Sequence, residues 1–152
     1  MSLKEKLQND LTAAMRSRDE VKSSTIRMVL TAIKNEEVSG KEARDLTDAE
    51  IITVLSREAK KRREAAEAFE QAGAADRAAA EKAEGVVIAD YLPKQLSESE
   101  IKELITAAIA ETGAAGPAQM GVVMKSLQPK IAGKADGGLV SGLVKAALSG
   151  GN

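Results

Sequence analysis

The 152-residue sequence contains no cysteine and no histidine. Without cysteine the chain cannot form disulfides or use a thiol nucleophile. Without histidine it lacks the commonest general base and the commonest transition-metal ligand. Phe69 and Tyr91 are its only aromatic residues, whereas strand-rich domains depend on aromatic and β-branched side chains. These absences exclude thiol and histidine chemistry and disfavour a β fold.

The sequence also lacks a strong net charge and a long apolar run. The formal net charge is −1, so nucleic-acid binding would require local charge asymmetry. No apolar stretch reaches the roughly 18–20 residues that a membrane span needs, and the N-terminal residues MSLKEKLQND contain no apolar signal-peptide core. We therefore expect a cytoplasmic protein with no membrane partner.

Strong helix formers, chiefly Ala, Glu, Lys and Leu, dominate the residues that are present. Thr47 with Glu50, and Ser97 with Glu100, match the capping box that opens a helix. Ser2, Asp76 and Asp136 are expected to be N-caps of other helices. A further helix is expected to start near Asp19, and Pro117 fits the first turn of another. Breaks are expected near Gly40, Gly73, Pro93 and Gly113. The pattern predicts an all-α fold of about four helices followed by three short ones.

Pro93 marks the expected domain boundary, because a residue that precedes proline avoids the helical region. The segments on either side of it carry apolar stripes of their own. We predict an N-terminal helical domain over residues 1–93 and a small three-helix tail module over residues 96–149.

Several stretches resemble the GatB/YqeY family. They are residues 26–36 (IRMVLTAIKNE), 58–64 (EAKKRRE), 91–97 (YLPKQLS), and 120–124 (MGVVM) continuing to 133–137 (GKADG). The family is similar to the tail of the B subunit of glutamyl/aspartyl-tRNA amidotransferase, and in those larger proteins the tail contacts tRNA. The resemblance implies an N-terminal helical domain followed by a tail that binds tRNA.

The amidotransferase subunit keeps its chemistry in a separate catalytic core, and a chain of this length has no room for that core. We therefore expect no catalysis, no catalytic residues and no cofactor. A description as a carbon–nitrogen ligase with glutamine as amido-N-donor would rest on homology alone. The alternative function is a protein–protein interaction module that binds a partner through the tail helices, which an exposed face of Met120, Val123 and Met124 would favour.

The candidate RNA-binding residues lie in the tail. From Thr112 onward the sequence has four lysines against one acid, Asp136. Glycines allow close backbone approach to a phosphate, and a helix N-terminus attracts anions. The candidates are Lys125, Lys130, Gly133, Lys134, Gly137 and Lys145. The alternative is a glycine-bracketed loop with ordinary solvated lysines, and the carboxylate of Asp136 would compete with phosphate for the same helix N-terminus.

Two other clusters are interpreted as structural. The run at residues 60–63 (KKRR) encircles a helix, because successive residues are about 100° apart, and Lys60–Glu64 and Arg63–Glu67 are expected to pair at i,i+4 spacing. Lys22, Ser23 and Ser24 share residue types with one class of amidase, but they lie together in a predicted helix without oxyanion donors. No cluster of carboxylates has the character of a metal site.

Arg62 interrupts the apolar seam of the third predicted helix. A charge at such a position must reach solvent or find a carboxylate. If the second and third helices form a hairpin around residues 38–46, Arg62 lies opposite residue 21. The sequence therefore predicts an ion pair between Arg62 and Asp19 or Glu20.

Overall fold

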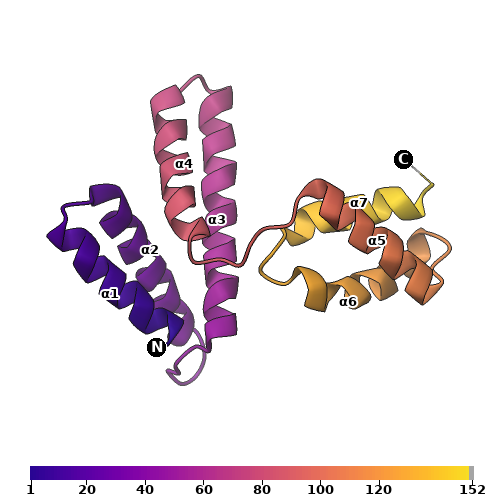
Figure 1. Cartoon of the computed structure of the whole chain (residues 1–152), viewed down its shortest axis with the longest axis horizontal. Coiled ribbons are helices and arrows are strands. Elements are labelled where there is room, and N and C mark those ends of the chain that lie inside the picture. The colour runs from indigo at the N-terminus through magenta and orange to yellow at the C-terminus, as the bar shows by residue number, and fades with distance from the viewer. Residues whose placement is uncertain (151–152) are drawn as a thin grey trace. The chain divides into compact units, whose positions relative to one another are not determined.

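The computed structural model describes residues 1–150. Within that range the chain is all-helical and has no strand, which confirms the predicted fold class (Figure 1). The elements in chain order are α1 (Leu3–Arg16), α2 (Glu20–Glu37), α3 (Asp48–Gln71), α4 (Ala75–Ala89), α5 (Glu98–Thr112), the 3-10 helix η1 (Pro117–Gln119), α6 (Met120–Ile131) and α7 (Gly137–Leu148).

Most helices begin where the capping signals predicted. Full capping boxes open α1, α3 and α5 at Ser2, Thr47 and Ser97, and Asp19 and Asp136 cap α2 and α7. The N-cap predicted at Asp76 is wrong. The turn closes earlier, where the Ala74 amide donates to the Phe69 carbonyl at 2.8 Å, so Asp76 lies in the first turn of α4. Its charge there suits the positive end of the helix dipole.

Contacts divide the chain after Leu92, and residues 1–92 form the first compact unit. In this unit α1 lies beside α2, and α3 and α4 form a long antiparallel hairpin (Figure 1). The core lies where the four helices converge and includes Leu7, Ile26, Ile33, Leu55 and Ile88, each fully buried.

Polar contacts to α2 and to the segment after α4 fasten α1 within the N-terminal unit. The carboxylate of Glu37, at the end of α2, accepts from Lys4 Nζ at 2.8 Å and 3.1 Å. The hydroxyl of Tyr91, just after α4, donates to Asp10 Oδ2 at 2.6 Å, while Lys6 lies over its ring. The first and last segments of this unit are therefore joined by side chains 81 residues apart in sequence.

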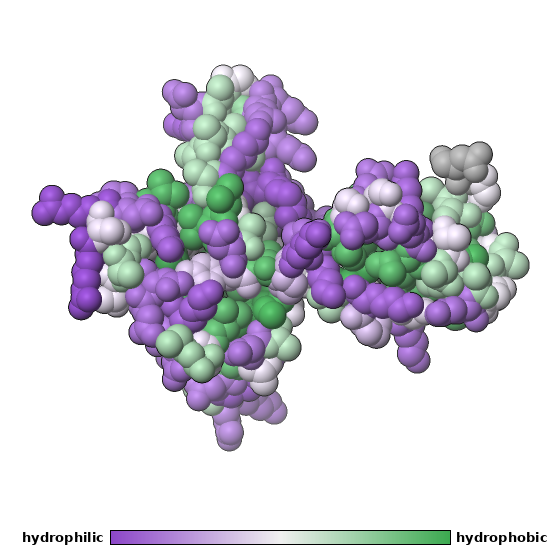
Figure 2. Space-filling model, viewed as in Figure 1, coloured by the Kyte–Doolittle hydropathy of each residue, from purple (hydrophilic) through white to green (hydrophobic). Residues whose placement is uncertain are grey.

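The second compact unit begins at Pro93. Its helices α5, α6 and α7 pack around a separate apolar cluster that includes Ile101, Ile105, Leu127 and Val144. Gly113 ends α5 with φ +66°, in the left-handed region that favours glycine. On the face that Figure 2 shows, hydrophilic residues cover much of each unit, and hydrophobic residues are visible in patches among them. Whether each unit folds alone stays a prediction.

Candidate nucleic-acid interface

The connection between α6 and α7 is a tight turn at Gly133 and Lys134. Gly133 has φ +72°, a conformation that side chains with a Cβ rarely adopt. The Lys134 amide donates back to the Ile131 carbonyl at 2.8 Å, and the Ala135 amide donates to the same carbonyl at 3.2 Å. The turn therefore favours glycine at position 133 and leaves the Lys134 side chain exposed.

The segment that leads into α5 clamps this turn. The Gln95 side-chain amide donates to the Gly133 carbonyl and to the Pro93 carbonyl, each at 2.8 Å. The Leu96 amide donates to the Lys134 carbonyl at 2.8 Å. Residues 91–97 and 133–137, two of the stretches that carry the family resemblance, are thus hydrogen-bonded to each other. Sequence reasoning missed the positioning role of Gln95, because only the fold brings these distant stretches together.

The N-terminus of α7 already has an intramolecular acceptor. Asp136 Oδ1 accepts from the Gly138 amide at 3.1 Å, so the carboxylate competes with a phosphate for this helix end, as the sequence suggested. Gly137 is the first residue of α7 and is exposed. A phosphate is therefore better placed at the lysine side chains than at the amides of α7.

The four candidate lysines are all exposed, but they do not form one patch. Lys130 lies in the last turn of α6, directly before the Gly133–Lys134 turn. Lys125 is five residues earlier on α6, about 140° around the helix from Lys130. Lys145 lies eight residues beyond Gly137, about 12 Å along α7. The compact part of the candidate surface is therefore Lys130, Gly133 and Lys134.

Charge is unevenly distributed within the C-terminal unit. Acids concentrate on α5, which carries Glu98, Glu100, Glu103 and Glu111. Lysines dominate α6, the turn and α7, where Asp136 is the single acid. Lys130 Nζ lies 3.9 Å from Glu111 Oε2, at the border between the two regions. An anionic ligand would therefore meet the α6–α7 side of this unit rather than α5.

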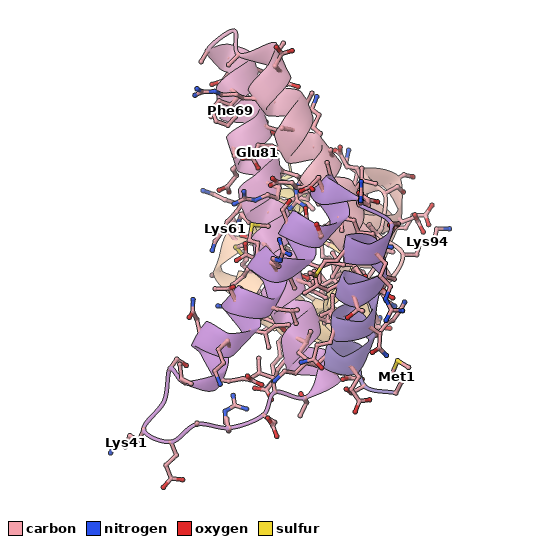
Figure 3. All side chains as sticks on the ribbon, turned by 90° about the vertical axis from the view of Figure 1, so that its left-hand side faces the viewer. Met1, Lys41, Lys61, Phe69, Glu81 and Lys94 are labelled. Carbon is pink, nitrogen blue, oxygen red and sulfur yellow. The ribbon has the colours of Figure 1, made fainter. Side chains whose placement is uncertain are left out.

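The basic run on α3 is partly neutralised within the N-terminal unit. Lys61 Nζ lies 3.0 Å from Glu58 Oε1, and Figure 3 shows Lys61 projecting from α3 into solvent. Arg62 Nη1 lies 3.0 Å from Glu81 Oε2 and 3.4 Å from Glu84 Oε2, both on α4. Arg62 does pair with carboxylates, but the partners predicted on α2 are wrong.

The serines at residues 23 and 24 are not arranged for catalysis. Ser23 Oγ donates to the Glu20 carbonyl at 3.3 Å and is buried, and Ser24 Oγ donates to the Val21 carbonyl at 3.2 Å. Both hydroxyl groups thus donate to backbone carbonyls of α2 itself. Over residues 1–150, no group of three or more acidic, histidine or cysteine side chains is placed to hold a metal ion, and none of the described helices is long and apolar enough to cross a membrane.

Fold and surface define an all-helical protein of two compact units, the second of which presents a lysine-bearing turn. The chain belongs to the YqeY-like family: the family model described as Yqey-like protein matches residues 4–148. This match confirms the resemblance seen in the sequence.

One curated relative is the "Altered inheritance of mitochondria protein 41, mitochondrial" of Clavispora lusitaniae. It is 34% identical to the chain over 102 residues, and the aligned region covers 66% of this chain and 58% of the relative. The chain thus aligns with less than two thirds of that protein. Mitochondrial inheritance is part of the name of that relative and is said of that relative alone.

Proposed function

We propose that the protein is a non-catalytic accessory factor whose C-terminal unit binds tRNA or another structured RNA through phosphate contacts. The observation that carries the proposal is the clamped turn at Gly133 and Lys134, which carries the exposed Lys134 four residues after the exposed Lys130 in the lysine-rich part of the unit. The turn is fixed by hydrogen bonds from Gln95 and Leu96, so RNA would meet a preformed surface at a low ordering cost. A cytoplasmic location is part of this proposal.

The structure gives less support to the alternative, a protein-binding face made of Met120, Val123 and Met124. Val123 is fully buried, and Met120 and Met124 are half-buried against the core of the C-terminal unit. The apolar face that would receive a protein partner is therefore largely used for packing.

A charge-reversal experiment tests the RNA proposal. Binding of a transcribed tRNA would be measured by filter retention at several salt concentrations for wild type and for Lys130→Glu/Lys134→Glu. We expect weak binding that falls with salt and falls further in the variant, because fewer phosphates are neutralised. Lys130→Gln/Lys134→Gln removes the charges without opposing Glu111. Lys102→Glu on α5 is the control in the same unit. Unchanged affinity in both double variants would remove the proposed surface.

As part of this proposal, we expect the chain by itself to have no amidotransferase activity. Purified protein supplied with glutamine, ATP and misacylated tRNA should yield no amidated product. A chain without cysteine or histidine, and with its Ser23 hydroxyl bonded inside α2, offers no evident nucleophile–base pair for glutamine. Sustained turnover without another subunit would contradict this part of the proposal.

A further inference from the structure

The segment that leads into α5 carries a lysine close to the turn at Gly133 and Lys134. The Leu96 amide donates to the Lys134 carbonyl at 2.8 Å. The Gln95 side chain donates to the Gly133 carbonyl at the same distance of 2.8 Å. Lys94 comes directly before these two donors in the chain and is exposed. The two hydrogen bonds therefore bring Lys94 near Lys134, although the two residues are far apart in the sequence.

The covalent chain sets an upper limit on the separation of the two lysines. Lys94 precedes Leu96 by two residues, and the Leu96 amide is hydrogen-bonded to the Lys134 carbonyl. With standard bond lengths, the Cα atoms of Lys94 and Lys134 lie no more than about 14 Å apart. An extended lysine side chain reaches about 6 Å from its Cα atom. Both ammonium groups can therefore contact phosphates of one short stretch of RNA.

Two acids close to these lysines are used to cap helices. Asp136 Oδ1 accepts from the Gly138 amide at 3.1 Å. Glu100 Oε1 accepts from the Ser97 amide at 3.1 Å. Hydrogen bonds from Ser97, and then the charge of Lys94, lower the pKa of Glu100. Glu100 is therefore an acid that offsets Lys94, and removal of its charge should strengthen the binding of an anion at Lys94.

The C-terminal unit, residues 93–152, contains no aromatic residue and no arginine, so all of its cationic side chains are lysines. Proteins that bind single-stranded RNA stack its unpaired bases on aromatic rings or on arginine planes. Lysine instead supplies a point charge on a flexible stem, which suits a phosphate. Double-helical RNA keeps its bases paired and stacked and presents its phosphates at the surface. The composition of the unit therefore favours double-helical RNA over unpaired bases.

We propose that Lys94 is a further RNA-binding residue, which acts with Lys130 and Lys134 in contacting the phosphate backbone of double-helical RNA. The inference rests on the RNA-binding function proposed above and names the kind of RNA structure that the unit binds. Because contacts to phosphate carry no base information, the sequence of the double helix should matter little. The hydrogen bonds of Gln95 and Leu96 fix the two backbone segments before RNA binds, which lowers the ordering cost.

Fluorescence anisotropy at several salt concentrations tests the inference on the full chain, with circular dichroism melts to verify folding. The probes are labelled RNA hairpins with two unrelated stem sequences and an unstructured RNA of the same length. Lys94→Gln removes the charge, and Lys94→Arg keeps it. Lys102→Gln is the matched control, because Lys102 is an exposed lysine on the acid-rich α5 of the same unit. Glu100→Gln removes the opposing charge and retains a residue that can complete a capping box.

We expect the two hairpins to bind the wild-type protein with similar affinity and more tightly than the unstructured RNA. Lys94→Gln should weaken hairpin binding about threefold, because one exposed ion pair to a phosphate is lost. It should also reduce the slope of log affinity against log salt by about one. Lys94→Arg and Lys102→Gln should bind like wild type, and Glu100→Gln should bind more tightly.

The outcomes separate this inference from the proposed function. A folded Lys94→Gln protein with wild-type affinity and salt slope, alongside weakened binding by Lys130→Gln/Lys134→Gln, would overturn the inference and leave the proposed function standing. Tighter binding of the unstructured RNA, or a strong preference for one stem sequence, would overturn the assignment to double-helical RNA. A wild-type protein that binds none of the probes would overturn the proposed function and the inference together.

Discussion

Arg62 of α3 donates from Nη1 to Glu81 of α4 at 3.0 Å, and the same nitrogen lies 3.4 Å from Glu84. One guanidinium that is 21% exposed therefore holds two carboxylates across the α3–α4 hairpin. Figure 3 shows Glu81 on this hairpin, nearer the body of the unit than Phe69. Arg62 thereby fastens α4 to α3.

Replacing Arg62 by alanine should lower the free energy of unfolding by roughly 1–3 kcal/mol, because the loss of the cation leaves Glu81 and Glu84 unpaired and close together. Urea denaturation followed by circular dichroism measures the change. Arg63→Ala, at the next and exposed position, should change stability by less than about 0.5 kcal/mol. The triple variant Arg62→Leu/Glu81→Gln/Glu84→Gln should recover much of the loss. An equal loss in the triple variant would show that the carboxylates are not the cause.

Tyr91→Phe should destabilise the N-terminal unit by about 1–2 kcal/mol, since the variant cannot donate to the Asp10 carboxylate. Burial and the adjacent carboxylate raise the pKa of Tyr91, so the hydroxyl stays protonated and donates throughout the neutral range. A double-mutant cycle with Asp10→Asn measures the coupling between the two side chains. Strictly additive effects would mean that the 2.6 Å contact contributes nothing to stability.

Stability should fall on acidification between about pH 4.5 and pH 2. The hydrogen bond from Arg44 holds the pKa of Glu50 at about 2, well below its ordinary value of 4.5. Lys4 lowers the pKa of Glu37, and the Ser97 amide lowers that of Glu100. Because these folded-state pKa values are depressed, the stability they provide is complete above the unfolded value and is lost as protons bind.

Urea titrations at about pH 7, 4.5 and 3 measure this dependence on pH. Glu50→Gln should be less stable at neutral pH and should lose less on acidification than wild type. Glu103→Gln, an exposed change on α5, is the control and should keep the wild-type slope. A Glu50→Gln protein with the full wild-type dependence would show that Glu50 does not contribute to the acid transition.

The C-terminal unit should fold without the N-terminal unit, and its stability should depend on residues 93–96. Residues 93–152, expressed alone, should give helical circular dichroism and a cooperative melt, because α5, α6 and α7 have their own apolar cluster. A fragment starting at residue 97 should melt at a lower temperature. It lacks the Gln95 bond to Gly133 and the Leu96 bond to Lys134. A disordered 93–152 fragment would mean that the tail depends on residues 1–92, and equal melting temperatures would mean that the clamp is not stabilising.

The sequence alone was sufficient for the order of the α-helices and for most of their starts. Capping is local, because the side chains of Ser97 and Glu100 each accept a hydrogen bond from the backbone amide of the other. A Ser followed three residues later by a Glu therefore identifies the start of α5. The same applies to the end of α5 at Gly113 and to the apolar stripes that build each core. The prediction of an N-cap at Asp76 was wrong because an acid in the first turn of a helix and an acid at the N-cap give the same local sequence pattern.

Only the tertiary structure decided which helices pair and which distant residues meet. The apolar stripe of α3 would be buried whether α3 paired with α2 or with α4. The sequence therefore did not show which of these helices carries the carboxylates that pair with Arg62. The structure pairs α3 with α4 around the turn at Gly73 and leaves a groove lined by Arg57 and Lys61 between α2 and α3. The clamp between Gln95 and Gly133 spans 38 residues. No local rule predicts such a contact, because it depends on how the packed helices place the two loops.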